Sequence, residues 1–213
     1  MSRIPTLLIA FAAAVSVLLA GEPPSKLPII KLPVRVHLMQ SNSMPDMHTT
    51  LVEADVRRIF AGINEVWEQA AIQFEIESVG PTIAVELDAD MRLKSEIERV
   101  KSMIPTRRLS PETIDICFVK EVTPNGFYYG DPVVVKDTAK LKKVPGGRDE
   151  QLRRVTSHEI GHALGLQHQE DSSRLMHVGV RGLSLSQAEI AAARAKALDL
   201  LAKIKAADGK NPG

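Results

Sequence analysis

The 213-residue chain has one cysteine, few aromatic residues and almost no excess of charge of either sign. Its single cysteine, Cys117, excludes a disulfide within the chain, so the fold must rely on its core or on bound ions. Lys and Arg number 27 against 26 Asp and Glu, a formal net charge of +1. A chain so close to neutrality has no general attraction for nucleic acid or anionic membranes, and we expect neither as a partner. Internal repeats and heptads are also lacking, which fits one globular domain.

Residues 1–20 differ in composition from the rest of the chain. Arg3 is their only charge, and from Ile4 onwards they are almost wholly apolar. This pattern is typical of a secretory signal peptide, with cleavage after Ala20 or Gly21. The apolar run contains a proline and is short for a membrane span. We therefore expect a secreted or periplasmic protein, with no stable membrane association after cleavage.

Three histidines at offsets of four and six residues form the main candidate site. Residues i and i+4 of a helix lie one above the other, so His158 and His162 present two imidazoles to one point. A catalytic zinc ion needs such a pair, a third protein ligand and an open position for water. Gly165 can take the left-handed conformation that ends a helix, which would bring in His168 as the third ligand. Glu159 could reach the water as a general base.

The alternative interpretation is a helix that carries unrelated surface or core histidines. The complete spacing favours zinc, because the pattern is HExxHxxGxxH and all its residue types are present. Through this pattern, residues 148–192 resemble the metzincin clan of zinc endopeptidases, in a matrixin-like form. The resemblance implies a methionine turn beneath the metal, and Met176, eight residues after His168, would form that hydrophobic floor without being a ligand.

The chain departs from the family pattern at three positions. Gln169 stands where matrixins usually have serine, and His177 where they often have tyrosine. Val178 replaces the tyrosine that some metzincins use as an extra ligand, so the resemblance implies three protein ligands only. Calcium sites are common among the proteins that the chain resembles. The sequence has no Asp-rich loop of the usual spacing, so it does not support a calcium ion here.

The resemblance also implies how a substrate binds. In metzincins the strand before the zinc helix forms the edge of the sheet and pairs with the extended substrate, a role that falls here within 126–135. Residues 177–182 correspond to a wall of the pocket for the first residue beyond the cut bond. The expected partner is therefore a protein or peptide bound as an extended strand.

Together, these features predict an α+β fold of the zincin type. The expected architecture is a twisted, mostly parallel sheet with an antiparallel edge strand, a backing helix, a zinc helix and a C-terminal helix. An extended lead-in at 21–33 precedes a catalytic domain at 34–208. Apolar periodicity and turn residues predict the elements. Strands are expected at 34–39, 72–77, 83–87, 113–122 and 133–135, and helices at 51–71, 90–104, 148–164 and 186–207.

Further predictions concern single positions. The patterns Thr50-x-x-Glu53 and Ser186-x-x-Glu189 are capping boxes that predict helix starts. His37 falls on the polar side of its strand, which predicts a surface residue and not a ligand. Cys117 lies in an apolar run, which favours a buried structural thiol. The 90–104 helix lies outside the resemblance and is interpreted as an insertion.

The expected function is that of an exported zinc-dependent endopeptidase that uses a zinc-bound water and Glu159. Two alternatives are a non-catalytic, zinc-stabilised binding module on the same fold and a zinc hydrolase that acts on something other than a peptide. A non-catalytic module is expected to have lost its general base, whereas Glu159 is present. This favours the enzyme.

Overall fold

The computed structural model describes residues 27–88, 90–110, 113–139, 151–179 and 182–208. The predicted signal peptide at 1–20 and the first part of the lead-in lie outside these residues. Among the described helices, none combines the length and the apolar character that a membrane crossing requires.

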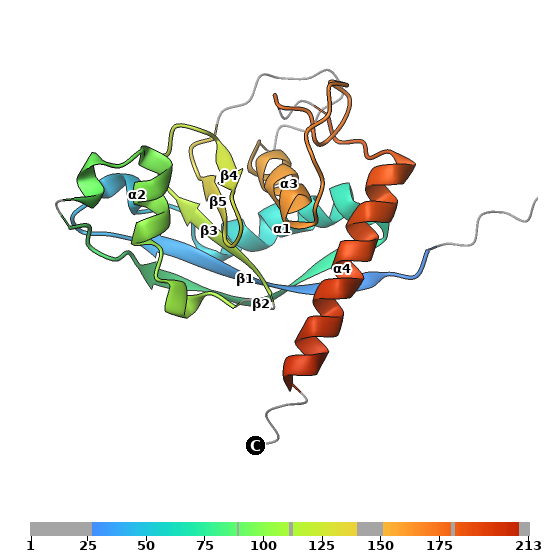
Figure 1. Cartoon of the computed structure of the whole chain (residues 1–213), viewed down its shortest axis with the longest axis horizontal. Coiled ribbons are helices and arrows are strands. Elements are labelled where there is room, and N and C mark those ends of the chain that lie inside the picture. Colours follow the sequence, from blue (N-terminus) through green and yellow to red (C-terminus); the bar gives the residue numbers. More distant parts are fainter. Residues whose placement is uncertain (1–26, 89, 111–112, 140–150, 180–181, 209–213) are drawn as a thin grey trace, which may run out of the picture.

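A five-stranded sheet in the order β2-β1-β3-β5-β4 forms the centre of the fold (Figure 1). Neighbouring strands run parallel except for β4, which pairs antiparallel with β5 at one edge. This confirms the predicted mostly parallel sheet with an antiparallel edge strand. The strands are β1 (Ile30–Gln40), β2 (Ile72–Ile83), β3 (Ile114–Val119), β4 (Gly126–Tyr128) and β5 (Val133–Lys136).

Helices cover both faces of the sheet. The backing helix α1 and the zinc helix α3 lie side by side on one face, α4 crosses one end of β1, and α2 lies near the other end (Figure 1). All four were predicted, but α2 was expected from residue 90 and begins only at Glu96. The expected start of α3 at 148 lies outside the described residues. The helices are α1 (Glu53–Trp67), α2 (Glu96–Met103), α3 (Gln151–Ala163) and α4 (Gln187–Asp208).

The two faces of the sheet belong to two separate apolar clusters. Alternate residues of β1, such as Val34 and Val36, join the large core beneath α1, α3 and α4. On the other face a smaller cluster joins Cys117 of β3 and Phe127 of β4 to Met103 of α2. The helix α2 therefore supports the face of the sheet that the zinc helix does not cover, and Cys117 is buried as predicted.

Two strand predictions were wrong in their limits. β1 begins at Ile30, inside the predicted lead-in, because it pairs along its whole length with β2. β2 is one strand of 12 residues that continues through Gly80 and Pro81, where the sequence predicted a break. The separate strand predicted at 83–87 was wrong, because Ile83 is the last residue of β2 and residues 84–87 are in no strand. β2 lies at an edge of the sheet, where a proline without an N–H group costs no ladder hydrogen bond.

One of the two capping boxes is present. The N–H of Ser186 donates to the Glu189 carboxylate (2.7 Å) and the N–H of Glu189 donates to the Ser186 hydroxyl (3.2 Å). The box at Thr50 was wrong. Its hydroxyl and N–H both donate to Asp137, 87 residues further along the chain, and α1 begins after Val52.

His37 was predicted at the surface but is buried in a polar network. Its Nε2 lies 2.8 Å from an Asp115 carboxylate oxygen and its Nδ1 lies 3.0 Å from the Thr82 hydroxyl. Arg35 donates two further hydrogen bonds of 2.9 Å to Asp115. The polar side of β1 therefore faces a carboxylate on β3 and not solvent.

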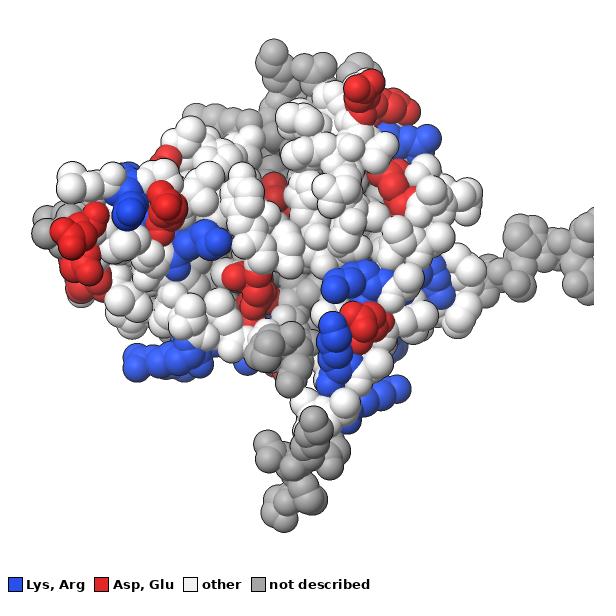
Figure 2. Space-filling view, viewed as in Figure 1, with Lys and Arg blue, Asp and Glu red and all other residues white. Residues whose placement is uncertain are grey.

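Most of the face drawn in Figure 2 is uncharged, and its basic and acidic side chains form small separate groups of both signs. This distribution agrees with the nearly balanced composition.

Candidate metal centre and adjoining cleft

The zinc helix ends in the turn that the sequence predicted. Gly165 has a φ of +81°, a left-handed conformation that glycine adopts without steric cost. The N–H of Gly165 donates to His162 O and the N–H of Leu166 donates to Gly161 O, both at 2.9 Å. This pair of bonds is the Schellman arrangement, which closes the helix and reverses the chain. The reversal carries His168 back towards the helix.

The three predicted histidines come together around one point. Their candidate ligand nitrogens all lie within 4.8 Å of one another, and His162 Nε2 lies 3.1 Å from His168 Nε2. The imidazole centroids are 4.9 Å apart for His158 and His162, 5.3 Å for His158 and His168, and 4.6 Å for His162 and His168. Exposure increases along the series, from buried His158 to exposed His168.

Backbone carbonyl groups orient two of the rings. His158 Nδ1 donates to Leu175 O at 2.7 Å, and His162 Nδ1 donates to Leu166 O at 2.9 Å. A proton on Nδ1 leaves the Nε2 lone pair of a neutral imidazole free to bind a metal. Burial lowers the pKa of His158 to about 4 and also lowers that of His162. Both rings are thus held in the neutral form that metal binding requires.

One pair of these nitrogens has the separation that a zinc ion requires. Ligands at about 2.0–2.1 Å in a tetrahedron lie about 3.3 Å from one another. The 3.1 Å separation of His162 Nε2 and His168 Nε2 is close to this value. Three neutral nitrogen ligands with one side open is the donor set of a catalytic zinc site. His158, His162 and His168 could therefore hold the zinc ion that the sequence indicated.

Met176 is completely buried beneath this centre. The preceding residue, Leu175, accepts the hydrogen bond from His158 and donates its own N–H to Ser184 O at 2.8 Å. The N–H of Gln169, next to His168, donates to Met176 O at 2.9 Å. The methionine turn thus supports the helical histidine and the returning histidine together.

Glu159 lies at the bottom of the site and is 6 % exposed. Burial raises the pKa of this carboxyl group to about 8. A divalent cation nearby would oppose this shift, because an opposite charge favours the ionised form. Gly126 of β4 packs against the stem of Glu159, and a Cβ at Gly126 would lie 2.9 Å from Glu159 Cγ. The absence of a side chain at Gly126 therefore makes room for this carboxylate.

A cleft of about 390 Å³ runs between β4 and the histidines. One side of the cleft is formed by the residues from Gly126 to Gly130, which belong to the segment 126–135 that the sequence indicated as the substrate edge. That a substrate pairs with them remains a prediction. Their partners across the cleft come from the zinc helix and the turn after it. The lining residues are Gly126, Phe127, Tyr128, Tyr129, Gly130, Glu159, His162, Gln167 and His168.

The outer side of β4 offers backbone hydrogen-bonding groups. The N–H of Lys136 donates to Asn125 O at 3.0 Å, and this pair is in register with the β4–β5 ladder. Bonded and non-bonded pairs alternate along an antiparallel ladder. Gly126 and Tyr128 are the non-bonded positions, so their N–H and C=O groups point away from β5. They face the open edge of the sheet.

Residues 177–182, expected to form a pocket wall, are described only in part. His177 is half-buried, and its Nδ1 accepts a hydrogen bond from the N–H of Gly179 at 3.0 Å. Val178 is 68 % exposed. Residues 180–181 lie outside the described part of the chain, so the predicted wall remains a prediction.

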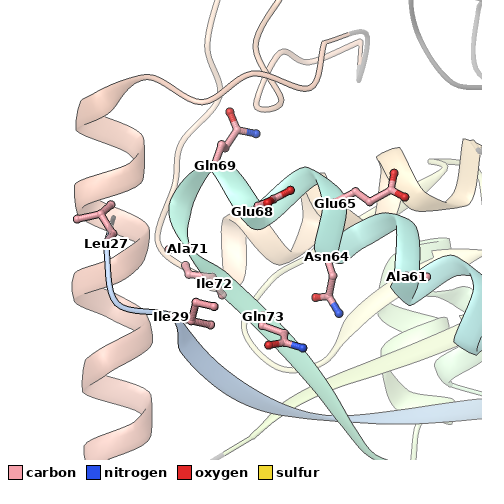
Figure 3. Close-up of a pocket in the computed structure, with 10 residues that line it drawn as sticks. All are labelled: Leu27, Ile29, Ala61, Asn64, Glu65, Glu68, Gln69, Ala71, Ile72 and Gln73. Carbon is pink, nitrogen blue, oxygen red and sulfur yellow. The ribbon is translucent and has the colours of Figure 1, made fainter. Parts of the chain in front are cut away.

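A larger cavity of about 630 Å³ lies away from the histidines, between the end of α1, the start of β2 and the residues before β1 (Figure 3). Exposed Leu27 and Ile29 contribute apolar surface, and Asn64, Gln69 and Gln73 contribute amide groups. Its lining holds no histidine or cysteine. Size alone therefore does not identify the site, whereas the chemistry of the smaller cleft does.

Sequence reasoning did not identify several groups that shape the site. The carbonyl groups of Leu166 and Leu175 orient the histidines, but a backbone acceptor leaves no residue-type signal. Gln167 and Gly126 line the cleft. The position of Gly126 directly before Phe127-Tyr128-Tyr129 was visible, but its contact with Glu159 depends on the packing of β4 against α3.

Comparisons with known proteins agree with this geometry. The family model for Matrixin matches residues 37–195. Mirolysin, solved in complex with a compound, has 14% sequence identity and a TM-score of 0.51 over 79% of this chain and 91% of its own. This similarity supports the fold. No curated protein matches the chain.

Two other solved structures share less of their geometry with the chain. Archaemetzincin from Methanopyrus kandleri has 16% identity and a TM-score of 0.44, over 86% of this chain and 98% of its own. Metalloproteinase-II from Bacteroides fragilis has 11% identity and a TM-score of 0.47, over 84% of this chain and 55% of its own.

The family match covers most of the chain and includes every residue of the histidine centre. The chain belongs to the matrixin family and is a zinc metalloendopeptidase.

Proposed function

We propose that the protein is an exported endopeptidase that cuts extended peptides with a zinc-activated water and Glu159 as general base. One observation carries this proposal: Glu159 and two of the three converging histidines, His162 and His168, line the same cleft as the edge strand β4. The cleft thus combines groups for hydrolysis with a backbone surface for a peptide.

His158, His162 and His168 would hold the ion. When bound, zinc lowers the pKa of a coordinated water towards about 7 and polarises a carbonyl group. The hydrogen bonds to Leu175 O and Leu166 O fix the first two rings in the neutral tautomer with Nε2 free. The protein therefore supplies two preoriented imidazoles whose pKa values are lowered towards the neutral form that binds a metal.

Glu159 would move the proton. Its carboxylate accepts a proton from the attacking water and then donates it to the amine that leaves. Burial raises the pKa of this group to about 8, which makes its protonated form easier to reach at the second step. The positive charge of the ion opposes the shift and favours the carboxylate at the first step.

The substrate would bind to β4 as an additional strand. Gly126 and Tyr128 direct their N–H and C=O groups away from β5, which suits an extended peptide along the edge of the sheet. Because these contacts use backbone groups, they hold a peptide in register whatever its side chains. Such binding explains why a protein or peptide is the expected substrate.

The Glu159→Gln variant tests this mechanism, because glutamine keeps the shape of the side chain but cannot accept the proton. We expect unchanged zinc content and a fall in kcat of at least about 10²- to 10⁴-fold. Cleavage of a peptide library, read by mass spectrometry, measures activity and gives the cut sites. Turnover equal to that of the wild type would remove Glu159 from the chemistry.

The same assay separates the enzyme from a non-catalytic module. A wild-type protein that holds one zinc ion per chain but cuts no peptide in the library would support a binding module on this fold. Cleavage that stops with a chelator and returns with zinc would support the endopeptidase.

Export is the second part of the proposal, and it rests on the apolar composition of residues 1–20. N-terminal sequencing of the protein recovered from the medium or periplasm tests it. We expect the mature chain to begin at Gly21 or Glu22. Recovery of the chain from the cytoplasm with its first residues intact would contradict export.

A further inference from the structure

The helix α2, whose role the family resemblance leaves open, lies along the segment 123–129, which contains β4, and meets it at three places. At its start, the Glu96 carboxylate accepts hydrogen bonds from the N–H of Thr123 (3.1 Å) and from the Thr123 hydroxyl, three residues before β4. In its middle, Val100 belongs to the same buried cluster as Phe127 of β4. Near its end, Lys101 Nζ donates to Tyr129 O at 3.2 Å. The helix therefore follows β4 from before its first residue to beyond its last.

The contact at Lys101 satisfies a carbonyl group that the sheet leaves without a donor. The β4–β5 register pairs Gly126 with Val135 and Tyr128 with Val133, so the next pair is Tyr129 with Pro132. Bonded pairs alternate along the ladder, and this next pair falls at a bonding position. Pro132 has no N–H group and cannot donate to Tyr129 O. The Lys101 ammonium group takes the place of that missing donor.

Lys101 also lies against the Tyr129 side chain. Its Nζ is 6.0 Å from the centroid of the Tyr129 ring, and that ring lies 6.0 Å from the ring of Phe127. Tyr129 is 65% exposed, so packing alone does not fix its position. Tyr129 lines the cleft that also contains Glu159 and His162. The Lys101 contacts therefore act on a part of the cleft wall that has few other restraints.

We propose that Lys101 is a positioning residue that holds Tyr129 and Gly130 in place as the far part of the substrate-binding edge. The inference rests on the proposed function, since it assigns a role within the same cleft. With Lys101 present, the edge extends beyond Tyr128, the last residue of β4. Peptides long enough to reach Tyr129 then gain contacts that shorter peptides do not make. Lys101 itself touches neither the reacting bond nor the metal ligands.

The test compares Lys101→Met with the wild type on a nested set of peptides around one cut site. The set is shortened from one end and then from the other. We expect kcat/KM of Lys101→Met to fall about threefold to tenfold, mainly through KM, for peptides that reach Tyr129. For peptides shortened at that end, the two proteins should have the same kcat/KM. A merely structural role would lower activity equally for all lengths.

Two further variants control this test. Lys101→Arg keeps a cationic donor at the same place and should restore the dependence on peptide length. Lys31→Met removes the same charge from an exposed lysine of β1 that pairs with Glu75, and should match the wild type on every peptide. Thermal unfolding and zinc content are measured for each protein, and both should be unchanged because Lys101 is exposed.

The outcomes separate this inference from the proposed function. A wild-type protein that cuts no peptide would overturn both. If the wild type cuts peptides but Lys101→Met shows the same ratio to it at every length, only the positioning role is overturned. A failure of Lys101→Arg to restore the dependence on length would overturn that role as well.

Discussion

Met176 packs directly against Gly161, the residue immediately before His162 on the zinc helix. A Cβ at Gly161 would lie 2.4 Å from Met176 Sδ and 3.1 Å from its Cε, closer than van der Waals contact allows. Both residues are buried, and Met176 has no exposed surface. The helix and the methionine turn can therefore meet at this distance only because position 161 has no side chain. This contact therefore fixes how closely the methionine turn approaches the zinc helix beneath the histidines.

We predict that Gly161→Ala displaces the methionine turn. The added methyl group overpacks the site and should lower the free energy of unfolding by about 1–3 kcal/mol. Since Leu175 O in the same turn orients His158, zinc should also bind more weakly. Thermal unfolding and zinc titration measure the two effects. Gly80→Ala is the matched control, because nothing lies within 4 Å of its added Cβ, and a similar loss in that variant would contradict the explanation.

A second prediction concerns removal of the metal. An ion that binds the folded chain and not the unfolded chain stabilises it by RT ln(1 + [L]/Kd), about 4.1 kcal/mol at 1,000 times Kd. We therefore expect a chelator to lower the melting temperature and added zinc to restore it.

Variants of two histidines control the metal experiment. In His168→Ala the rise of the melting temperature on addition of zinc should be largely lost, because one of the three converging nitrogens is absent. His48→Ala should keep the full rise, since exposed His48 lies outside the histidine centre and pairs with Ser41 O. An equal response of the two variants to zinc would argue against the assigned centre.

The sequence predicted the metal centre because its geometry is local. Helical spacing of four residues is enough to bring His158 and His162 together, and a glycine at 165 is enough to reverse the chain. The 11 residues from His158 to His168 therefore contain most of the information that forms the centre. The carbonyl acceptors that complete it come from the backbone and were not readable.

The predictions that failed all depended on partners distant in the sequence. Thr50 was expected to cap α1, but Asp137 accepts its hydrogen bonds. His37 was expected at the surface, but Asp115 lies beside it on β3. The break at Pro81 was expected because the sequence does not show that β2 is an edge strand. The local sequence pattern predicts whether a segment is a helix or a strand. Which of its residues are buried, and whether a strand lies at an edge, depend on the whole sheet.

The pH dependence of stability provides a third prediction, at Asp131. Asp131 is exposed as a residue, but partial desolvation of its carboxyl group and then repulsion from the Asp115 carboxylate raise its pKa to about 7, from an ordinary value of 3.8. The folded chain thus binds this proton more tightly than the unfolded chain does. The stabilising contribution of the protonated group is complete below pH 3.8 and is lost as the pH rises through about 7.

In Asp131→Asn this loss should not occur. The amide oxygen can still accept the hydrogen bond from the N–H of Asp115, which is 3.4 Å long in the wild type. We expect the variant to gain stability relative to the wild type as the pH rises from about 4 to about 7. Urea unfolding at several pH values measures the difference. Asp46→Asn, which removes an exposed carboxylate elsewhere, is the matched control for the change of charge.

The last prediction concerns Cys117, because the reactivity of this one thiol measures how often the buried face of β3 becomes accessible. It is the only cysteine of the chain, it is completely buried on β3, and burial raises the pKa of its thiol well above the usual range. A thiol in this environment does not react in the folded protein. We expect a thiol reagent to label the native protein very slowly and the protein in denaturant at once.

Zinc should slow this labelling, although the histidines lie in another part of the fold. If Cys117 reacts only after global unfolding, and unfolding and refolding are fast relative to labelling, the rate follows the unfolded population. Zinc at 100 times its Kd would then reduce the rate by about 100-fold, the factor by which it favours the folded chain. In His168→Ala the effect should largely disappear. A labelling rate in the wild type that does not respond to zinc would mean that the β3 face opens locally, without disrupting the metal centre.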